Sequence, residues 1–355
     1  MPDLHDLSCV VHVHSTYSDG TATVPEIAAA AKAAGAGAVL ITDHDTLGAL
    51  RDGWEGRHDG VLVLVGMEIS PKGGHYLAFG LREEVGHEGR DARAICRAVA
   101  AAGAVGFAAH PFSEGARISR TIAPPHGWPD LDDRCVTGIE LWSLVTDTAE
   151  NAASMRELVR FIRDPEAVLD GPPPRHLAAW DRICARRRLA AIGGLDAHQT
   201  GVRVRGRVVS PMRHERFFGL LRTHALLRGA PDGELEHDRA LVYEALREGS
   251  CLLHRPTVAP AAGARMWAEL PDGRELPVGA EADAIAGQLR IRLPARADVR
   301  VLRDGRQIAA AADADTLDVP IDGPGAVRFE ARIGGRLWLL SNPVYLRAPV
   351  PRARQ

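Results

Sequence analysis

The stretch SCVVHVHSTYSDG, residues 8–20, places two histidines at the end of an apolar run, directly before a polar loop. The apolar run predicts a β-strand, and side chains alternate between the two faces of a strand. The spacing of two therefore puts the imidazoles of His12 and His14 on the same face. Asp19 follows in the loop, where its carboxylate can join them. Imidazole and carboxylate groups together are typical ligands of zinc, manganese or iron, so this stretch predicts a metal site.

The same pattern recurs at four later points of the chain, each time where an apolar run stops. The runs are TDHD at 42–45, GMEIS at 66–70, AHP at 109–111 and GLDAH at 194–198. A single histidine is more often a core or surface residue. Five strand ends that each carry His, Asp or Glu favour a shared site, because the carboxyl ends of parallel strands open onto one face of a barrel. More than four such ligands indicate more than one metal ion.

The periodicity of residues 10–195 is typical of an α/β fold, in which strands alternate with crossover helices. Strands are predicted over 10–13, 38–42, 61–69, 75–79, 104–109, 136–142 and 189–195, and helices over 91–102, 148–163, 176–188, 213–228 and 238–248. Beyond residue 257 the pattern changes to short strands separated by turns such as Asp304-Gly305 and Gly334-Gly335. We expect two domains, an α/β barrel with a helical extension over 1–256 and an all-β sandwich over 257–355.

In this order, the runs HVHSTYSDG, TDHD, GMEIS, AHPF and GLDAH resemble the motifs of the PHP family, the polymerase and histidinol phosphatase domain. The resemblance covers residues 8 to about 200 and implies a distorted (β/α)7 barrel with a trinuclear metal centre. It implies one ion held by His12, His14, Glu68 and Asp196, a second held by Glu68, His75 and His110, and a third held by Asp19, His44 and His198. RFFGLLRTH and the later SNPVY also resemble two-domain PHP proteins of the carbaryl-hydrolase branch.

These ligands predict a metal-dependent hydrolase in which a metal-bound hydroxide attacks a phosphate mono- or diester. No Gly-x-Ser-x-Gly elbow, Walker A or GxGxxG loop supports another mechanism. The candidate catalytic residues outside the ligand set are Asp45, Glu140, Arg117 and Arg203, with Arg120 and Arg205 as further candidate phosphate contacts. Asp45 could orient His44 or act as an acid or base, and Glu140 could face the site or the barrel interior. Two alternatives remain, a carbamate, amide or carboxyl-ester hydrolase, and a non-catalytic scaffold with a binding sandwich.

Composition and charge limit the classes of partner that we expect. The net charge of −3 does not favour nucleic-acid binding, and neither a leader nor a membrane-spanning stretch is recognisable, so we expect a cytoplasmic protein that acts on a small phosphorylated substrate. The sequence does not determine the metal or the oligomeric state. The 5 cysteines lack a CxxC pair and are expected to be free thiols. Of the 15 histidines, His5, His58, His87, His126 and His176 are expected to lie at the surface, and a helical or capping role is favoured for His224.

Overall fold

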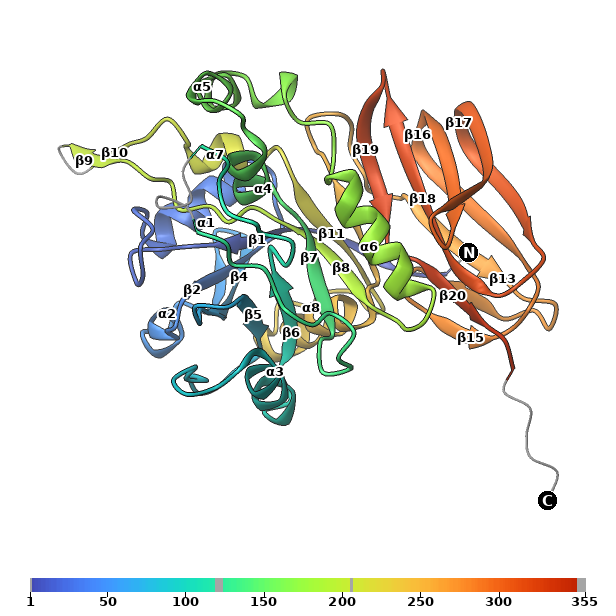
Figure 1. Ribbon diagram of the computed structural model, residues 1–355, viewed down its shortest axis with the longest axis horizontal. Coiled ribbons are helices and arrows are strands. Elements are labelled where there is room, and N and C mark those ends of the chain that lie inside the picture. The colour runs from blue at the N-terminus through green and yellow to red at the C-terminus, as the bar shows by residue number, and fades with distance from the viewer. Residues whose placement is uncertain (1, 119–123, 205–206, 350–355) are drawn as a thin grey trace.

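The structure, a computed structural model, describes residues 2–118, 124–204 and 207–349. An N-terminal α/β part and a C-terminal part made of strands lie side by side, with helix α6 (Pro174–Cys184) against the strands of the C-terminal part (Figure 1). None of the described helices is both long and apolar enough to cross a membrane.

The α/β part is built on a ring of seven strands. They are β1 (His5–Val13), β2 (Ala38–His44), β4 (Val61–Ile69), β5 (His75–Phe79), β6 (Val105–Ala109), β7 (Gly138–Ser143) and β8 (Ala190–Gly194). The segment after β8 closes the ring onto β1, where Leu195 N donates to Val11 O at 2.9 Å and His14 N donates to Ala197 O at 3.0 Å. This confirms the predicted α/β barrel.

One strand of the ring runs against the others, and this decides where a predicted ligand lies. β1, β2 and β4 are mutually parallel, as are β6, β7 and β8, but β5 is antiparallel to both of its neighbours. The first residue of β5 therefore lies at the edge where the parallel strands end. His75 pairs with Ala109, so it stands beside His110 at that edge.

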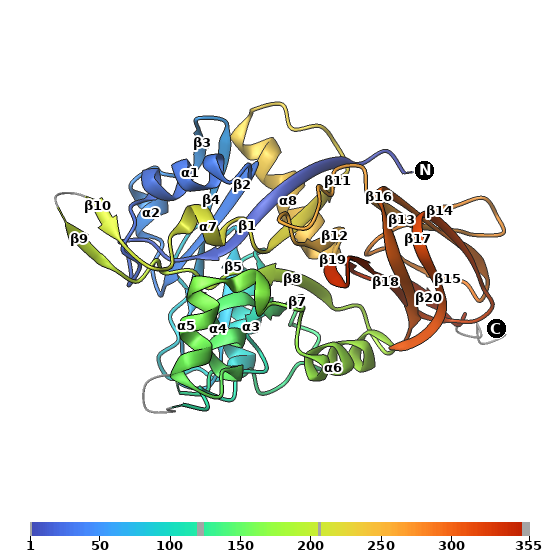
Figure 2. The same ribbon diagram turned by 90° about the horizontal axis from the view of Figure 1, so that it is seen from above.

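The helices of the α/β part lie around the ring (Figures 1 and 2). Besides α6, they are α1 (Val24–Ala33), α2 (Gly48–Arg51), α3 (Ala92–Ala101), α4 (Leu144–Asn151), α5 (Met155–Arg163), the 3-10 turn η1 (Pro165–Ala167), α7 (His214–Phe217) and α8 (Leu235–Glu248). The helix predicted over 148–163 is two helices, because Ala152 is extended and Ser154 caps a new start, its side chain accepting from Glu157 N.

The helix predicted over 213–228 is wrong. Only α7 is helical there, and strand β11 (Arg222–Leu227) follows it. β11 pairs antiparallel with β1 on one side and with β12 (Cys251–His254) on the other, and all six of its residues are buried. Pairing on both edges satisfies the backbone of this segment, and that outweighs the helical propensity of its Leu and Ala residues. His224 is thus a strand residue, and its Nε2 donates to Asp6 at 2.6 Å.

The remaining strands lie mostly in the C-terminal part. They are β3 (Gly56–His58), β9 (Val202–Val204), β10 (Arg207–Val209), β13 (Arg265–Glu269), β14 (Glu275–Pro277), β15 (Glu281–Asp283), β16 (Gly287–Arg303), β17 (Arg306–Ile321), β18 (Gly325–Ile333), β19 (Arg336–Ser341) and β20 (Val344–Arg347). In this part, where short strands are predicted, β16 is a single strand of 17 residues, and its pairing with β17 shifts register between Arg292 and Ala297.

The α/β part and the C-terminal part are joined by strand pairing and by a buried ion pair. β12 pairs with β19 as well as β11, so the sheet continues from the barrel into the C-terminal part, and the boundary predicted at residue 257 stays a prediction. Arg328 of β18 is buried and binds both oxygens of Asp181 on α6, at 2.7 and 2.8 Å. Removal of either partner from such a buried pair strongly destabilises the fold, because the other partner then keeps an uncompensated charge.

The expectation that all five cysteines are free thiols is wrong for two of them. Cys96 of α3 and Cys135, ahead of β7, form a disulfide. Cys9, Cys184 and Cys251 are free and buried, as expected. The pairing joins residues 39 positions apart. No local motif such as CxxC indicates it, since the two cysteines approach only when α3 packs on the barrel.

Candidate metal centre

Glu68, at the end of β4, is the common neighbour of the predicted ligands. Its side chain is fully buried, and its two oxygens face different histidines. Oε2 lies 3.2 Å from Nε2 of His12, 3.2 Å from Nε2 of His14 and 3.3 Å from Nδ1 of His44. Oε1 lies 2.9 Å from Nδ1 of His75 and 3.2 Å from Nε2 of His110. A carboxylate in this position can bridge two metal ions.

The first group of donors is formed by His12, His14, Glu68 and Asp196, whose ligand atoms lie within 4.8 Å of one another. Asp196 Oδ1 is 3.4 Å from Nε2 of each histidine. Both histidines are fully buried, and both Nε2 atoms lie 3.2 Å from the same oxygen of Glu68, so the two imidazoles share one side of β1 as predicted. Burial of a carboxylate beside a second carboxylate is costly without a positive charge between them, and a cation at this point would supply it.

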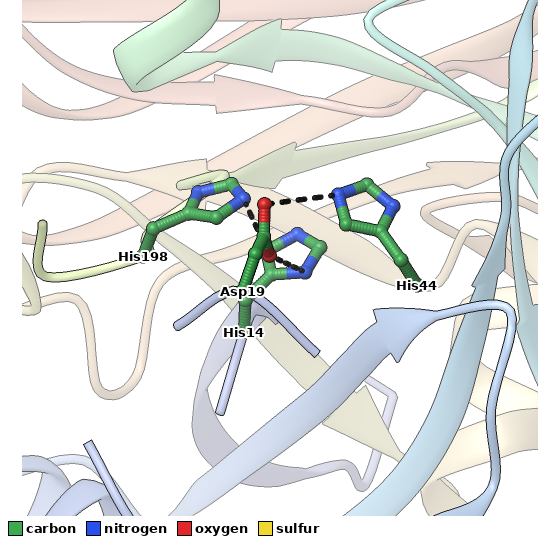
Figure 3. A group of neighbouring side chains, drawn as sticks. All are labelled: His14, Asp19, His44 and His198. Atoms are coloured by element: carbon green, nitrogen blue, oxygen red, sulfur yellow. Dashed lines mark ion pairs between the residues drawn. The ribbon is translucent and has the colours of Figure 1, made fainter. Parts of the chain in front are cut away.

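A second group consists of His14, Asp19, His44 and His198, and Figure 3 shows Asp19 between the three imidazoles. Asp19 Oδ1 lies 3.3 Å from Nε2 of His198 and 3.7 Å from Nδ1 of His14, and Oδ2 lies 3.8 Å from Nε2 of His44. His14 therefore stands between the two groups. Neither of its ring nitrogens has a hydrogen-bond partner among the described residues, as suits a ring whose lone pair faces a cation.

The third set consists of Glu68, His75 and His110, and its two histidines lie against Oε1 of Glu68. The rings of His75 and His110 have centres 5.1 Å apart and are nearly perpendicular. The structure thus brings all nine predicted ligands to one edge of the barrel. Their chemistry, neutral imidazoles with carboxylates, fits divalent transition metals.

The backbone is strained at the ends of three of the strands that carry these groups. His12, His110 and Asp196 have positive φ angles of 64°, 28° and 52°, which non-glycine residues rarely adopt. The pairing of β1 with β2 shifts register at His12, as at a β-bulge. Bulges and strained residues occur next to active sites because they re-aim side chains, and here they turn the predicted ligands towards Glu68.

Glu140, on β7, lies behind the predicted ligands rather than in the open site. Nδ1 of His12 donates to its Oε1 at 2.9 Å, and the backbone N–H of His110 donates to its Oε2 at 2.8 Å. The bond to Nδ1 leaves Nε2 of His12 to face Glu68 and Asp196. Gly194 makes room for this arrangement, since a Cβ there would stand 2.0 Å from Oε1 of Glu140.

Asp43 holds the loop that carries Asp19, a role that the sequence did not reveal. Its carboxylate accepts from the backbone and hydroxyl of Ser15, at 2.8 and 2.7 Å, and from the hydroxyl of Ser18 at 2.6 Å. Asp43 is 2% exposed although it adjoins a predicted ligand. The two aspartates of TDHD therefore differ, because the first orders the loop whereas the second, Asp45, is exposed and accepts from Ser70 N.

The electrostatics of the site reflect this mutual proximity. Burial acts against the charged form of His14, but the nearby carboxylates of Asp196 and Glu68 raise its pKa to about 9. Burial likewise acts against ionised Glu68, yet the charge of His12 holds the pKa of Glu68 well below its usual range. Burial lowers the pKa of His44, which is then neutral and able to ligate.

The other candidate catalytic residues lie less centrally. Asp45 is exposed, accepts from Ser70 N at 3.0 Å and lies 3.4 Å from His87, while Ser70, not Asp45, contacts Nδ1 of His44 at 2.6 Å. Arg117 is exposed on the loop after β6, and Arg203 lies on β9, paired with Val208. Arg120 and Arg205 lie outside the described residues.

Two of the histidines expected at the surface are not there. His176 is 2% exposed and stacks on Phe112, with ring centres 4.4 Å apart. His126 is partly buried and packs on His75, with ring centres 4.3 Å apart. Burial, and then the neighbouring His75 and His110, lower the pKa of His126 to about 4. Its polar setting in PPHGWP gave no sign of this, because a long connection brings it back over the site.

Comparison with known proteins supports the resemblance found in the sequence. Residues 11–160 match the family model of the PHP domain. No curated protein is significantly similar to the chain.

The solved structures that are similar to it include the following three. A two-domain protein from Bacteroides vulgatus, containing a predicted PHP-like metal-dependent phosphoesterase, is 16% identical, with 96% of this chain and 95% of that one covered and a TM-score of 0.46. A candidate metal-dependent phosphoesterase from Bifidobacterium adolescentis is 19% identical, with 56% and 88% covered and a TM-score of 0.36. An amidohydrolase from Chromobacterium violaceum, with bound sulfate and no metal, is 18% identical, with 54% and 87% covered and a TM-score of 0.31.

Proposed function

We propose that this chain, which carries a PHP domain in residues 11–160, is a metal-dependent hydrolase of phosphate mono- or diesters. The observation that carries the proposal is the position of Glu68. Its two buried oxygens face five histidines from the ends of four strands, β1, β2, β5 and β6, as expected of a carboxylate shared between metal ions. We further propose three divalent ions, zinc, manganese or iron, held by the three ligand sets named above.

Divalent ions in such a cluster activate water and polarise a phosphoryl oxygen. The chain itself supplies the geometry around them. Glu140 holds His12 in the tautomer that presents Nε2 to the site, and it also binds the backbone before His110. Asp43 orders the loop of Asp19. The bulged, strained strand ends keep the donors in place before substrate binds, so that little reorganisation is needed during the reaction.

Substrate binding needs positive groups near this edge of the barrel. We propose Arg117, on the loop after β6, and Arg203, on strand β9 in the segment after β8, as the phosphate contacts, because a guanidinium can donate two parallel hydrogen bonds to a phosphate. Asp45 is exposed near the site and is proposed as a proton donor or acceptor for the leaving group. The substrate is then a small phosphorylated molecule.

The test is hydrolysis of a panel of aryl phosphomonoesters, phosphodiesters and aryl carbamates by protein loaded in turn with Zn²⁺, Mn²⁺ or Fe²⁺. We expect cleavage of at least one phosphate ester, lost in His12→Ala and kept in His58→Gln. His58 is a suitable control because its Nε2 contacts Trp54 O at 2.9 Å, outside the ligand set. Cleavage of carbamates alone would show that the protein is a hydrolase of carbamates and not of phosphate esters. Failure to bind any of these metals would favour a non-catalytic scaffold.

A further inference from the structure

His126 occupies a place that none of the nine predicted ligands fills. Its ring lies 4.3 Å from that of His75 and 6.3 Å from that of His110, measured between ring centres. These are the two imidazoles that face Oε1 of Glu68. This subsite also has three protein donors, whereas each of the other two groups has four when His14 is shared.

One ring nitrogen of His126 lacks a partner. Nδ1 is buried and makes no hydrogen bond to any residue that the structure describes. A buried polar atom of this kind costs free energy unless something satisfies it, and an imidazole nitrogen is satisfied either by a hydrogen bond or by a metal ion. The rings next to it are those of His75 and His110, and both of these face Oε1 of Glu68. His126 therefore adjoins a ligand set.

Two of the three ring separations fall within the range expected of imidazoles on one ion, and the third lies just below it. Zinc-bound imidazole nitrogens lie about 2.1 Å from the metal, so the ring centres of two such ligands lie roughly 4.5 to 6.5 Å apart, depending on the angle between them. The His75–His110 separation of 5.1 Å and the His110–His126 separation of 6.3 Å fall within this range, and the His75–His126 separation of 4.3 Å is just below it.

The backbone around His126 is held firmly against the strand ends. Its N–H donates to the hydroxyl of Ser113 at 3.0 Å, and that hydroxyl donates in turn to buried Glu150. Trp128 N donates to Pro111 O at 2.9 Å, and the Trp128 ring packs on Tyr76, with ring centres 4.9 Å apart. At Gly127 a Cβ would stand 2.8 Å from Ser113 O, so only glycine allows this approach.

From these contacts we propose that His126 is a tenth protein ligand of the metal centre, which completes the subsite of Glu68, His75 and His110 through Nδ1. The inference rests on the metal centre of the proposed function, but not on the bond that is hydrolysed. It makes the short stretch that carries His126, residues 126–128, part of the site.

The experiment is a titration of the metal-free full chain with Co²⁺, followed by equilibrium dialysis with elemental analysis and by visible absorption, which depends on the number and type of ligands. His126→Gln and His126→Ala are compared with wild type and with His58→Gln. We expect both His126 variants to bind one class of Co²⁺ at least tenfold more weakly and with altered visible absorption. The other classes should be unchanged, and His58→Gln should match wild type.

Circular dichroism identifies which variants are folded. Two replacements of different polarity are used so that the test can still be made if one variant does not fold. The inference is overturned if a folded His126 variant gives the isotherm and the spectrum of wild type. Because no substrate enters this titration, its outcome is separate from that of the proposed function. A protein with His126-dependent Co²⁺ binding that cleaves no phosphate ester would refute the proposed function alone.

Discussion

Glu140 offers the sharpest test of how the barrel positions its metal ligands. In Glu140→Gln the side chain keeps its volume but loses its charge and one acceptor. At present both of its oxygens accept, one from Nδ1 of His12 at 2.9 Å and one from the backbone of His110 at 2.8 Å. An amide has one acceptor oxygen, so its NH2 group must face one of these two donors in a site from which water is excluded.

The size of the effect follows from that loss. A hydrogen bond to a charged group contributes about 1.5 to 3 kcal/mol, which corresponds to roughly 10- to 150-fold in an equilibrium constant. Replacement of groups that orient metal ligands typically costs about 10- to 100-fold in metal affinity or activity. We therefore expect Glu140→Gln to bind metal about 10- to 100-fold more weakly and to lose kcat/KM by a similar factor.

Equilibrium dialysis with elemental analysis measures the affinity, and Glu330→Gln is the matched control. Glu330 is also a buried carboxylate with charged partners, 2.8 Å from Arg328, but it lies on β18 in the C-terminal part. The control should lose stability and keep its metal affinity. The reasoning is refuted if Glu140→Gln binds metal as wild type does, or if both variants weaken binding equally.

Three further outcomes are expected. Burial, and then the charge of Glu140, raise the pKa of Asp147 well above its usual range. The folded state therefore keeps a proton that the unfolded state releases above about pH 4, so the free energy of unfolding falls as the pH rises towards the folded pKa. In Asp147→Asn the urea midpoint should fall less with pH than in wild type and should exceed that of wild type at neutral pH. Parallel plots of midpoint against pH for the two proteins would contradict this. Arg328→Met leaves the buried carboxylates of Asp181 and Glu330 without their partner and should lower the free energy of unfolding by about 3 to 5 kcal/mol, measured with urea, whereas an unchanged midpoint would show that the pair is not formed. Removal of metal with a chelator should lower the melting temperature, since an ion present at 100 times its Kd stabilises the fold by about 2.7 kcal/mol, and calorimetry showing equal melting with and without metal would argue against a bound ion.

The barrel and the meeting of its ligands could be predicted from the sequence because they depend on short-range rules. The alternation of strand side chains places His12 and His14 together, and parallel strands bring their carboxyl ends to one edge. In the structure His12 and His14 both face Glu68, although a bulge interrupts the alternation at His12. The resemblance to the PHP motifs implied all nine residues that meet at this edge, Glu68 and eight others.

The errors have a common origin in contacts between residues far apart in the chain. The segment of β11 has the composition of a helix, but β1 and β12 pair with it from both sides. Cys96 and Cys135 meet only when α3 packs on the barrel. The sequence could not decide which way Glu140 faces either, because its direction depends on the glycine at 194 in the neighbouring strand.

By itself, the sequence determined which groups are available for chemistry and at which strand ends they stand, since local periodicity encodes both. The tertiary structure alone decided how those groups face one another. The reversed direction of β5 brings His75 to the site, and the loop between β6 and β7 brings His126 onto it. The physical reason is that strand pairing and loop return are set by packing over the whole barrel, and no local pattern records them.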